Sequence, residues 1–206
     1  MIAYASRTGT RRNLAALREA GWRLLVSATG VLRTESFPYA LDNGAWSAYA
    51  QGQPFNERAF VKALRKLGGG ADWTVIPDIV AGGAASLELS LRWMRHVLDE
   101  CPRALIAVQD GMVAEDVRHL LGPRVGIFVG GSTNWKLETL DGWGLLGREI
   151  GCWVHVGRVN TARRIRCCSW AGATSFDGTS ASRYAQTIRP LDAARRQLNL
   201  LRIGDP

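Results

Sequence analysis

The chain is predicted to be an α/β protein that forms a compact single-domain (β/α)8 TIM barrel over residues 1–206. Short aliphatic and β-branched segments alternate with amphipathic helical segments, which is typical of a parallel sheet. Eight strand-like segments favour a closed barrel over the alternative, an open doubly wound sheet. No linker, low-complexity tract or change of composition divides the chain. Such barrels have about 250 residues, so this one would carry few insertions.

The predicted strands share a short apolar run followed by turn residues. They are residues 2–5, 24–27, 39–42, 73–78, 104–109, 125–129, 153–156 and 174–177. In a barrel of parallel strands all the carboxyl ends lie on one face, and TIM-barrel enzymes place their active sites there.

Helical periodicity predicts helices within residues 10–21, 56–70, 85–101, 113–122 and 161–172. In the third of these, Leu87, Leu91, Met94 and Leu98 recur at intervals of three or four residues. Gly21 is a C-terminal stop signal for the first. Residues 29–38 have no helical period, so we expect a loop in place of one crossover helix.

The composition favours a phosphate-bearing partner. There are 26 Lys and Arg against 18 Asp and Glu, which gives a net charge of +8. Arginine clusters within residues 6–12, 157–166 and 192–202, and its planar guanidinium suits phosphate. The alternative is a coding bias that leaves solvated arginines on helix faces.

Neither a metal, a cofactor nor a membrane is expected. The cysteines form no CxxC motif and have only three histidines as potential partners, so buried, reduced thiols are the simpler interpretation. No apolar run approaches the roughly 20 residues that span a bilayer, and the first residues do not resemble a secretory signal. We therefore expect a soluble cytoplasmic protein. The cysteines are Cys101, Cys152, Cys167 and Cys168.

Acidic residues end four of the apolar segments: Asp42, Asp78, Asp110 (preceded by Gln109) and Asp177. Any one of them can simply shape a turn or cap the next helix. Several acids at the same end of a basic barrel indicate a functional site, because bringing like charges together costs free energy. The pattern predicts an acidic site at the carboxyl ends of the strands.

Five motifs, in the same order, resemble those of the guanine transglycosylases, which exchange guanine in a polynucleotide for a 7-deazaguanine. They are LDNGAW, SLRWMRHVLDEC, AVQDG, VGGSTNWKLET and HVGRVNTARRIRCCSWAGATSFDGTSASR. Together they extend over residues 39–183. The resemblance implies Asp177 as nucleophile, Asp42 as general base and Asp78 as reader of the guanine edge. It implies that Gln109 contacts the base carbonyl, assisted by a backbone N–H near Gly131.

The resemblance further implies that the base lies against Gly130, Gly131 and Gly157. Arg183 matches a family arginine near the nucleophile, and we expect it to contact the nucleic acid. Arg158, Arg163 and Arg164 follow a predicted strand end directly, so they can approach the phosphates of a nucleic acid, and an exposed helix face is an equally open interpretation. The aromatic rings of Trp46 and Tyr49 can pack on the base, and a core role is equally open to them.

The family members that act on tRNA carry a C-x-C-x2-C…H zinc site after the nucleophile, and no cysteine follows Asp177 here. The chain therefore resembles the short, zinc-free branch that acts on DNA in 7-deazaguanine modification systems, including those of bacteriophages. If a phage encodes the chain, we expect it in the host cytoplasm. The expected activity is exchange of guanine in DNA for a free 7-deazaguanine base, without a cofactor. The alternatives are a tRNA-guanine transglycosylase, a nucleoside or N-glycoside hydrolase with the same acids, and a non-catalytic nucleic-acid-binding subunit.

Overall fold

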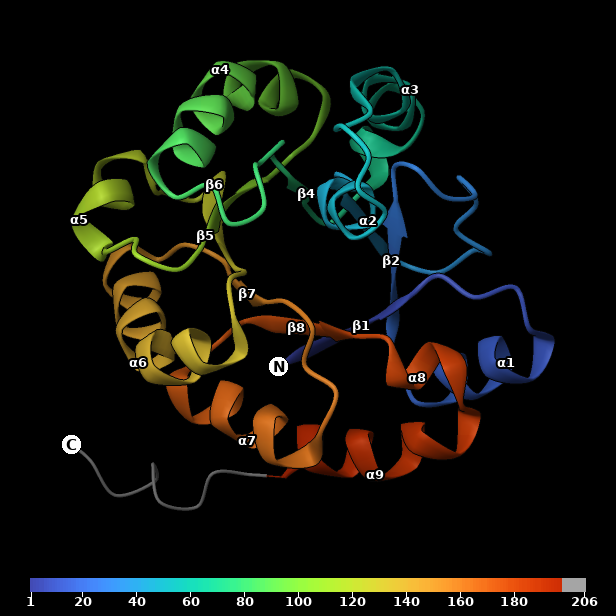
Figure 1. Ribbon diagram of the computed structural model, residues 1–206. Helices are drawn as coiled ribbons and strands as arrows, with labels where there is room; N and C mark the ends of the chain where they lie inside the picture. Colours follow the sequence, from blue (N-terminus) through green and yellow to red (C-terminus); the bar gives the residue numbers. More distant parts are fainter. Residues whose placement is uncertain (198–206) are drawn as a thin grey trace.

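A computed structural model describes residues 1–197 and shows a closed barrel of eight parallel strands. Each strand pairs with the next, and β8 pairs with β1 to close the ring, which is surrounded by helices (Figure 1). The predicted fold class is confirmed. The strands are β1 Ile2–Ser6, β2 Arg23–Ser27, β3 Tyr39–Asp42, β4 Thr74–Val75, β5 Ala104–Val108, β6 Val125–Val129, β7 Val154–Val156 and β8 Ser175–Gly178.

All eight predicted strands are present, but the fourth is much shorter than residues 73–78. Ile76 still donates its N–H to the Leu105 carbonyl, and Pro77 then has no N–H to donate. The chain leaves the sheet there, so Asp78 lies on the loop beyond β4.

The described helices are α1 Arg11–Glu19, α2 Ala45–Ala50, α3 Glu57–Leu67, α4 Ala84–Glu100, α5 Ala114–Val117, α6 Thr133–Ile150, α7 Ala162–Ala171, α8 Ser180–Arg183 and α9 Ala185–Arg196, with 3-10 turns Gly68–Gly70 and Arg118–Leu120. Four predicted helices correspond to α1, α3, α4 and α7. The helix predicted within 113–122 is a single α turn followed by the second 3-10 turn. Residues 29–38 form the expected loop. Helix α6 was not predicted, and no helix within residues 1–197 is long and apolar enough to cross a membrane.

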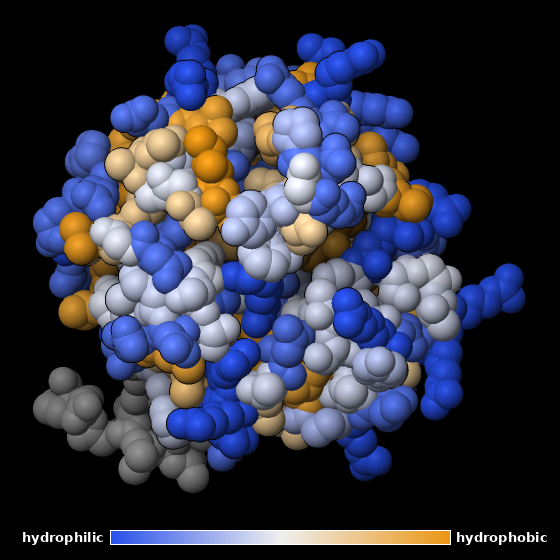
Figure 2. Space-filling model, viewed as in Figure 1, coloured by the Kyte–Doolittle hydropathy of each residue, from blue (hydrophilic) through white to orange (hydrophobic). Residues whose placement is uncertain are grey.

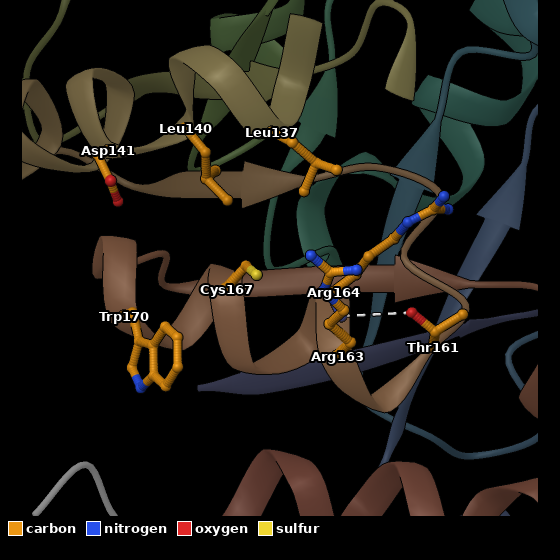
Figure 3. Close-up of a pocket in the computed structure, with 8 residues that line it drawn as sticks. All are labelled: Leu137, Leu140, Asp141, Thr161, Arg163, Arg164, Cys167 and Trp170. Carbon is orange, nitrogen blue, oxygen red and sulfur yellow. Dashed lines mark hydrogen bonds between the residues drawn. The ribbon is translucent and has the colours of Figure 1, made fainter. Parts of the chain in front are cut away.

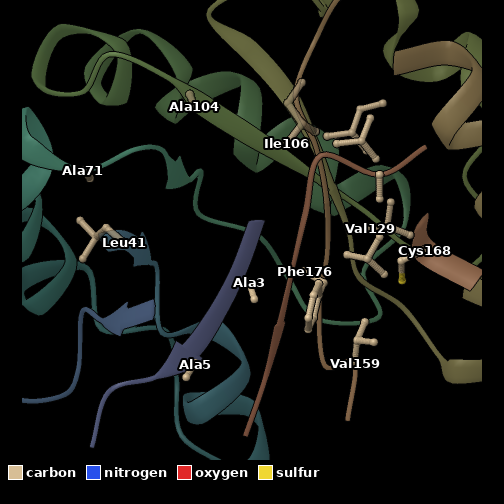
Figure 4. Close-up of a cluster of buried hydrophobic side chains, with 14 of the residues drawn as sticks. Ala3, Ala5, Leu41, Ala71, Ala104, Ile106, Val129, Val159, Cys168 and Phe176 are labelled. Atoms are coloured by element: carbon tan, nitrogen blue, oxygen red, sulfur yellow. The ribbon is translucent and has the colours of Figure 1, made fainter. Parts of the chain in front are cut away.

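Alternation along the strands separates two apolar clusters. Ala3 and Ala5 face the helices in the larger one, where Phe176 and Ile106 also lie (Figure 4). Tyr4, between the two alanines, belongs to the smaller cluster inside the barrel. This smaller cluster forms the floor beneath the strand ends. Its buried members are Tyr4, Ala40, Trp73, Val75, Leu105 and Ala107.

All four cysteines are free thiols and three are buried, as predicted. The basic cluster at 192–202 lies partly outside the described residues. Its described members Arg195 and Arg196 pair with Asp192 and bond to the Ala20 carbonyl, so they join α9 to α1. Those two arginines have a structural role.

Candidate active site at the carboxyl ends of the strands

The alternation of side chains along the strands directs the predicted site residues into the barrel. Ala40 and Ala107 belong to the interior cluster, so Asp42 and Gln109, two residues further along, point into the same barrel. On the opposite wall, Asp177 contacts the buried ring of His155. Figure 2 shows strongly hydrophilic atoms at the centre of the face that these strand ends form.

Asp78 and Asp177 both lie close enough to Asp42 for their charges to act on it. Burial raises the pKa of Asp42 to about 7, and the charges of Asp177 and Asp78 act in the same direction. Burial raises the pKa of Asp78 to about 6, against the opposing effect of a hydrogen bond from Asn43. The structure therefore brings the three acids together, as the sequence pattern predicted.

Asn43 fixes the position of Asp78. Its buried amide donates to the Ile76 carbonyl and to Asp78 Oδ1, both at 2.8 Å. Its oxygen accepts the Ala45 N–H at 2.8 Å, at the start of α2. Gly44 makes this turn possible, because its φ is +84° and a side chain there would meet Thr29 at 2.9 Å. One asparagine thus joins the ends of β3 and β4.

Two hydrogen bonds hold the carboxylate of Asp177, which is 5% exposed. Its Oδ1 accepts from His155 Nε2 at 3.1 Å and from the Arg158 backbone N–H at 3.2 Å. Both bonds go to the same oxygen, so Oδ2 has no hydrogen-bond donor within residues 1–197.

The buried network behind Asp177 determines the protonation of His155. Trp153 Nε1, which can only donate, bonds to Ser175 Oγ at 2.8 Å. The Ser175 hydroxyl is then free to donate to His155 Nδ1, also at 2.8 Å. Burial lowers the pKa of His155 and favours the neutral ring. We assign the Nε2–H tautomer from this network, because it gives Asp177 a donor. Ser175 is fully buried, so the network does not present it as a nucleophile.

Gln109 holds the loop that carries Asp78. Its amide nitrogen donates to the Ile79 carbonyl at 2.8 Å and to Ser86 Oγ at 2.7 Å. A longer contact of 3.4 Å reaches Asp78 Oδ2. Both N–H groups are thus engaged within the protein, and a base carbonyl would have to displace one of these bonds. The predicted contact of Gln109 with a base remains a prediction.

The glycines after β6 and β7 allow close approach to the site. A side chain at Gly157 would lie 2.8 Å from the Phe128 ring and 3.5 Å from Asp177 Oδ1. Gly131 has a φ of +68°, and a side chain there would meet Asp110 Oδ2 at 2.5 Å. Gly130 donates its N–H to the Val108 carbonyl, which holds the β6 end against β5.

Asp110 does not join the other acids. It is exposed and accepts both the N–H and the hydroxyl of Ser132 at 2.6 Å. These bonds, with Ser132 as the largest cause, lower the pKa of Asp110. Asp110 therefore stabilises the loop before α6, which is the turn-shaping role that the sequence left open.

Arg158 spans the mouth of the barrel. Its guanidinium lies 4.0 Å from the centre of the Trp46 ring and donates to the Gly131 carbonyl at 2.5 Å. Its φ is +60°, an uncommon conformation for a residue with a side chain, and burial lowers its pKa. The ring of Trp46, for which the sequence left a base contact and a core role equally open, packs on Arg158, while the neighbouring ring of Tyr49 is 57% exposed.

The other residues predicted to contact nucleic acid are not part of the group of acids formed by Asp42, Asp78 and Asp177. Arg163 and Arg164 are in the first turn of α7, and Arg183 ends α8. The ion pairs of residues 1–197 include none of these three guanidinium groups.

Three residues of the site escaped the sequence analysis: Asn43, His155 and Lys136. The buried Lys136 donates to the Gly157 carbonyl at 2.5 Å, and burial and the charge of Arg158 lower its pKa to about 8. His155 lies on β7 two residues before Gly157, which directly follows that strand, and this spacing was a signal for an inward side chain. Lys136 had no such signal, because α6 itself was not predicted.

Within residues 1–197, no three His, Cys, Asp or Glu side chains are arranged to hold a metal ion. The arrangement offers a carboxyl that exchanges a proton near neutral pH beside a carboxylate with one uncommitted oxygen.

No protein-family model matches the chain, and a search of curated proteins found no similar protein. The likeness to guanine transglycosylases therefore remains a prediction from the motifs.

Proposed function

We propose that the protein is a DNA-guanine transglycosylase that exchanges guanine in DNA for a free 7-deazaguanine base. One observation carries the proposal: Asp42, whose pKa is raised to about 7, interacts with Asp177, whose Oδ1 is held by two hydrogen bonds. Base exchange needs a nucleophilic carboxylate and a second carboxyl that both gives and takes a proton.

The reaction proceeds through a covalent intermediate. Oδ2 of Asp177 attacks C1′ of the target nucleotide, and the C1′–N9 bond breaks with its electron pair going to the departing guanine. Asp42, protonated, gives this guanine its proton. The incoming base then loses its ring proton to the Asp42 carboxylate and attacks C1′, which releases Asp177. Each group ends as it began, and no oxidant or reductant is required.

Asp78 provides base recognition in this proposal. Guanine and its 7-deaza analogues present N1–H and an amino group side by side, and one carboxylate accepts from both. Adenine lacks the ring N–H, so it would leave the Asp78 carboxylate partly unpaired. Asn43 already holds Oδ1 of Asp78 in place, which supports a fixed orientation for this contact.

The target nucleotide must leave the base stack to reach the barrel. The basic surface supports binding of the surrounding backbone, because phosphate contacts supply affinity without sequence choice. The choice of DNA over tRNA rests on the resemblance to the zinc-free branch.

The test is incubation of the protein with labelled guanine and single-stranded DNA, duplex DNA or tRNA. We expect label in DNA and a denaturation-resistant protein–DNA adduct. Asp177→Asn should abolish both, while Asp99→Asn, an exposed change on α4, should abolish neither. Exchange by the Asp177→Asn protein would disprove the mechanism. Release of guanine without incorporation would indicate a hydrolase, and binding without either reaction would indicate a non-catalytic subunit.

A further inference from the structure

A cavity of about 660 Å³ lies outside the barrel, between α6 and α7 (Figure 3). Its lining includes none of Asp42, Asp78 and Asp177, and it has no role in the proposed chemistry. Its lining residues are Leu137, Leu140, Asp141, Thr161, Arg163, Arg164, Cys167 and Trp170.

Side chains at helical spacing on α6 and α7 line the two walls of this cavity. Arg163, Cys167 and Trp170 are spaced at i, i+4 and i+7 on α7, so they share one face. Leu137 and Asp141 are spaced at i and i+4 on α6 and line the opposite wall. The two helices approach closely at Gly144, where a side chain would overlap the Ala171 carbonyl.

The cationic end of the cavity favours an anion. Arg163 and Arg164 lie in the first turn of α7, which contains no acidic residue. Cations at the N-terminal end of a helix are unfavourable, because the helix dipole is positive there. Within residues 1–197 neither guanidinium group has a carboxylate partner. A bound phosphate would compensate both charges.

The opposite end is suited to an aromatic ring. Trp170 is 52% exposed, and Leu140 provides a buried apolar wall. Figure 3 shows Asp141 and Trp170 at the end of the cavity away from Thr161 and Arg164. The exposed carboxylate of Asp141 can accept from an amino group. Seven residues separate Arg163 from Trp170, so the two ends are about 10 Å apart along the helix.

We propose that this cavity is a second nucleotide subsite, which takes a nucleotide flanking the target in the same strand. Its phosphate lies against Arg163 and Arg164, and its base stacks on Trp170 with an amino group directed to Asp141. The subsite rests on the proposed function in one respect, that the bound strand also enters the barrel. Helix α7 begins four residues after Arg158, so the phosphate end adjoins the mouth.

The test measures binding and needs no turnover. Single-stranded deoxyoligonucleotides of three and nine residues with a central guanine are titrated at several salt concentrations. We expect Trp170→Ala to weaken binding of the nonamer roughly tenfold and that of the trimer little, because the variant has no ring on which a base can stack. Trp170→Phe should keep most of the nonamer affinity. Arg163→Ala/Arg164→Ala should lower the salt slope by about 0.7 for each phosphate that the protein no longer neutralises.

The matched control is Arg92→Ala/Arg95→Ala, which removes two exposed arginines from α4 and should leave the slope nearer the wild-type value. Equal effects of the two double variants would show a general charge effect and overturn the subsite. Nonamer binding by Trp170→Ala equal to wild type would also overturn it. Tighter binding of an acidic peptide of equal charge would assign the cavity to a protein partner instead. The Asp177→Asn variant keeps the cavity but lacks the proposed nucleophile. Its affinity for the nonamer therefore tests the subsite separately from the proposed catalysis.

Discussion

Asp42 and Asp177 have the same side chain but different surroundings, and this difference divides the proposed chemistry between them. Asp177 accepts two hydrogen bonds on one oxygen, and its other oxygen accepts none within residues 1–197. Asp42 experiences burial and two neighbouring negative charges, which favour its protonated form. In the proposed mechanism, Asp42 therefore exchanges a proton near neutral pH, and the second oxygen of Asp177 forms the bond to C1′.

The raised pKa of Asp42 predicts a pH dependence of stability. In the unfolded chain an aspartate has a pKa of about 3.9. Between that pH and about 7 the folded state holds a proton that the unfolded state has released, so the free energy of unfolding falls as pH rises. Asp42→Asn removes this effect. We expect its stability relative to wild type to increase by roughly 1–3 kcal/mol between pH 4.5 and pH 8, measured by urea unfolding. Asp99→Asn is the control, and an unchanged difference would contradict the assignment.

The hydrogen-bond network predicts a neutral His155 with its proton on Nε2. Nitrogen-15 NMR of the imidazole distinguishes this tautomer from the Nδ1–H form and from the cation. We expect the Nε2–H form from pH 5 to pH 8, since burial lowers the pKa. Ser175→Ala removes the donor to Nδ1 and should lower stability by about 1–3 kcal/mol, because Trp153 Nε1 and His155 Nδ1 would then have no partner there. A charged ring at pH 6 in the wild type would contradict this network.

Helix α6 was not predicted because it contains glycines, which weaken the helical signal of the sequence. Gly142, Gly144 and Gly147 lie within Thr133–Ile150, and glycine lowers helix propensity. Two of them are required by packing: a side chain at Gly144 would overlap the Ala171 carbonyl, and one at Gly147 would overlap the Val154 side chain. Tertiary contact with α7 and β7 therefore overrides propensity, which no local pattern reveals.

The same helix provides a matched pair of substitutions. Gly142→Ala meets no atom within 4 Å and should stabilise the protein by about 0.5–1 kcal/mol through helix propensity. Gly144→Ala should destabilise it by at least about 2 kcal/mol, because α7 must move away. Thermal unfolding of both variants measures the difference. Equal effects of the two substitutions would show that α6 and α7 are not in close contact.

Short apolar runs followed by turn residues correctly predicted the barrel and the convergence of Asp42, Asp78 and Asp177. The prediction succeeded because all the strands of a closed parallel barrel end on the same face, so residues at those ends lie close together. It missed Asn43, His155 and Lys136, whose roles arise from contacts between distant segments. The roles assigned to Asp78, Gln109 and the glycines depend on a bound base and remain predictions.

At the scale of the whole molecule, Arg158 connects three separate parts of the rim. It extends from the β7 end to Trp46 on α2 and to Gly131 after β6, while its own N–H bonds to Asp177. Its φ of +60° costs on the order of 1 kcal/mol, which these contacts offset. A base that stacks on Trp46 must first displace the guanidinium, so Arg158 would compete with the base and still attract the phosphate backbone.

This double role predicts opposite effects of one substitution on two ligands. Arg158→Ala should bind free guanine roughly 2- to 30-fold more tightly, the factor that corresponds to a cation–π contact of about 0.5–2 kcal/mol. The same variant should bind single-stranded DNA more weakly, with a smaller salt slope, because it has one positive charge fewer at the mouth. Arg158→Lys keeps the charge but not the planar stacking, so it should retain the salt slope while still binding guanine more tightly than wild type. Calorimetry with guanine and with a nonanucleotide measures both, and changes in the same direction would mean that Arg158 does not cover the base site.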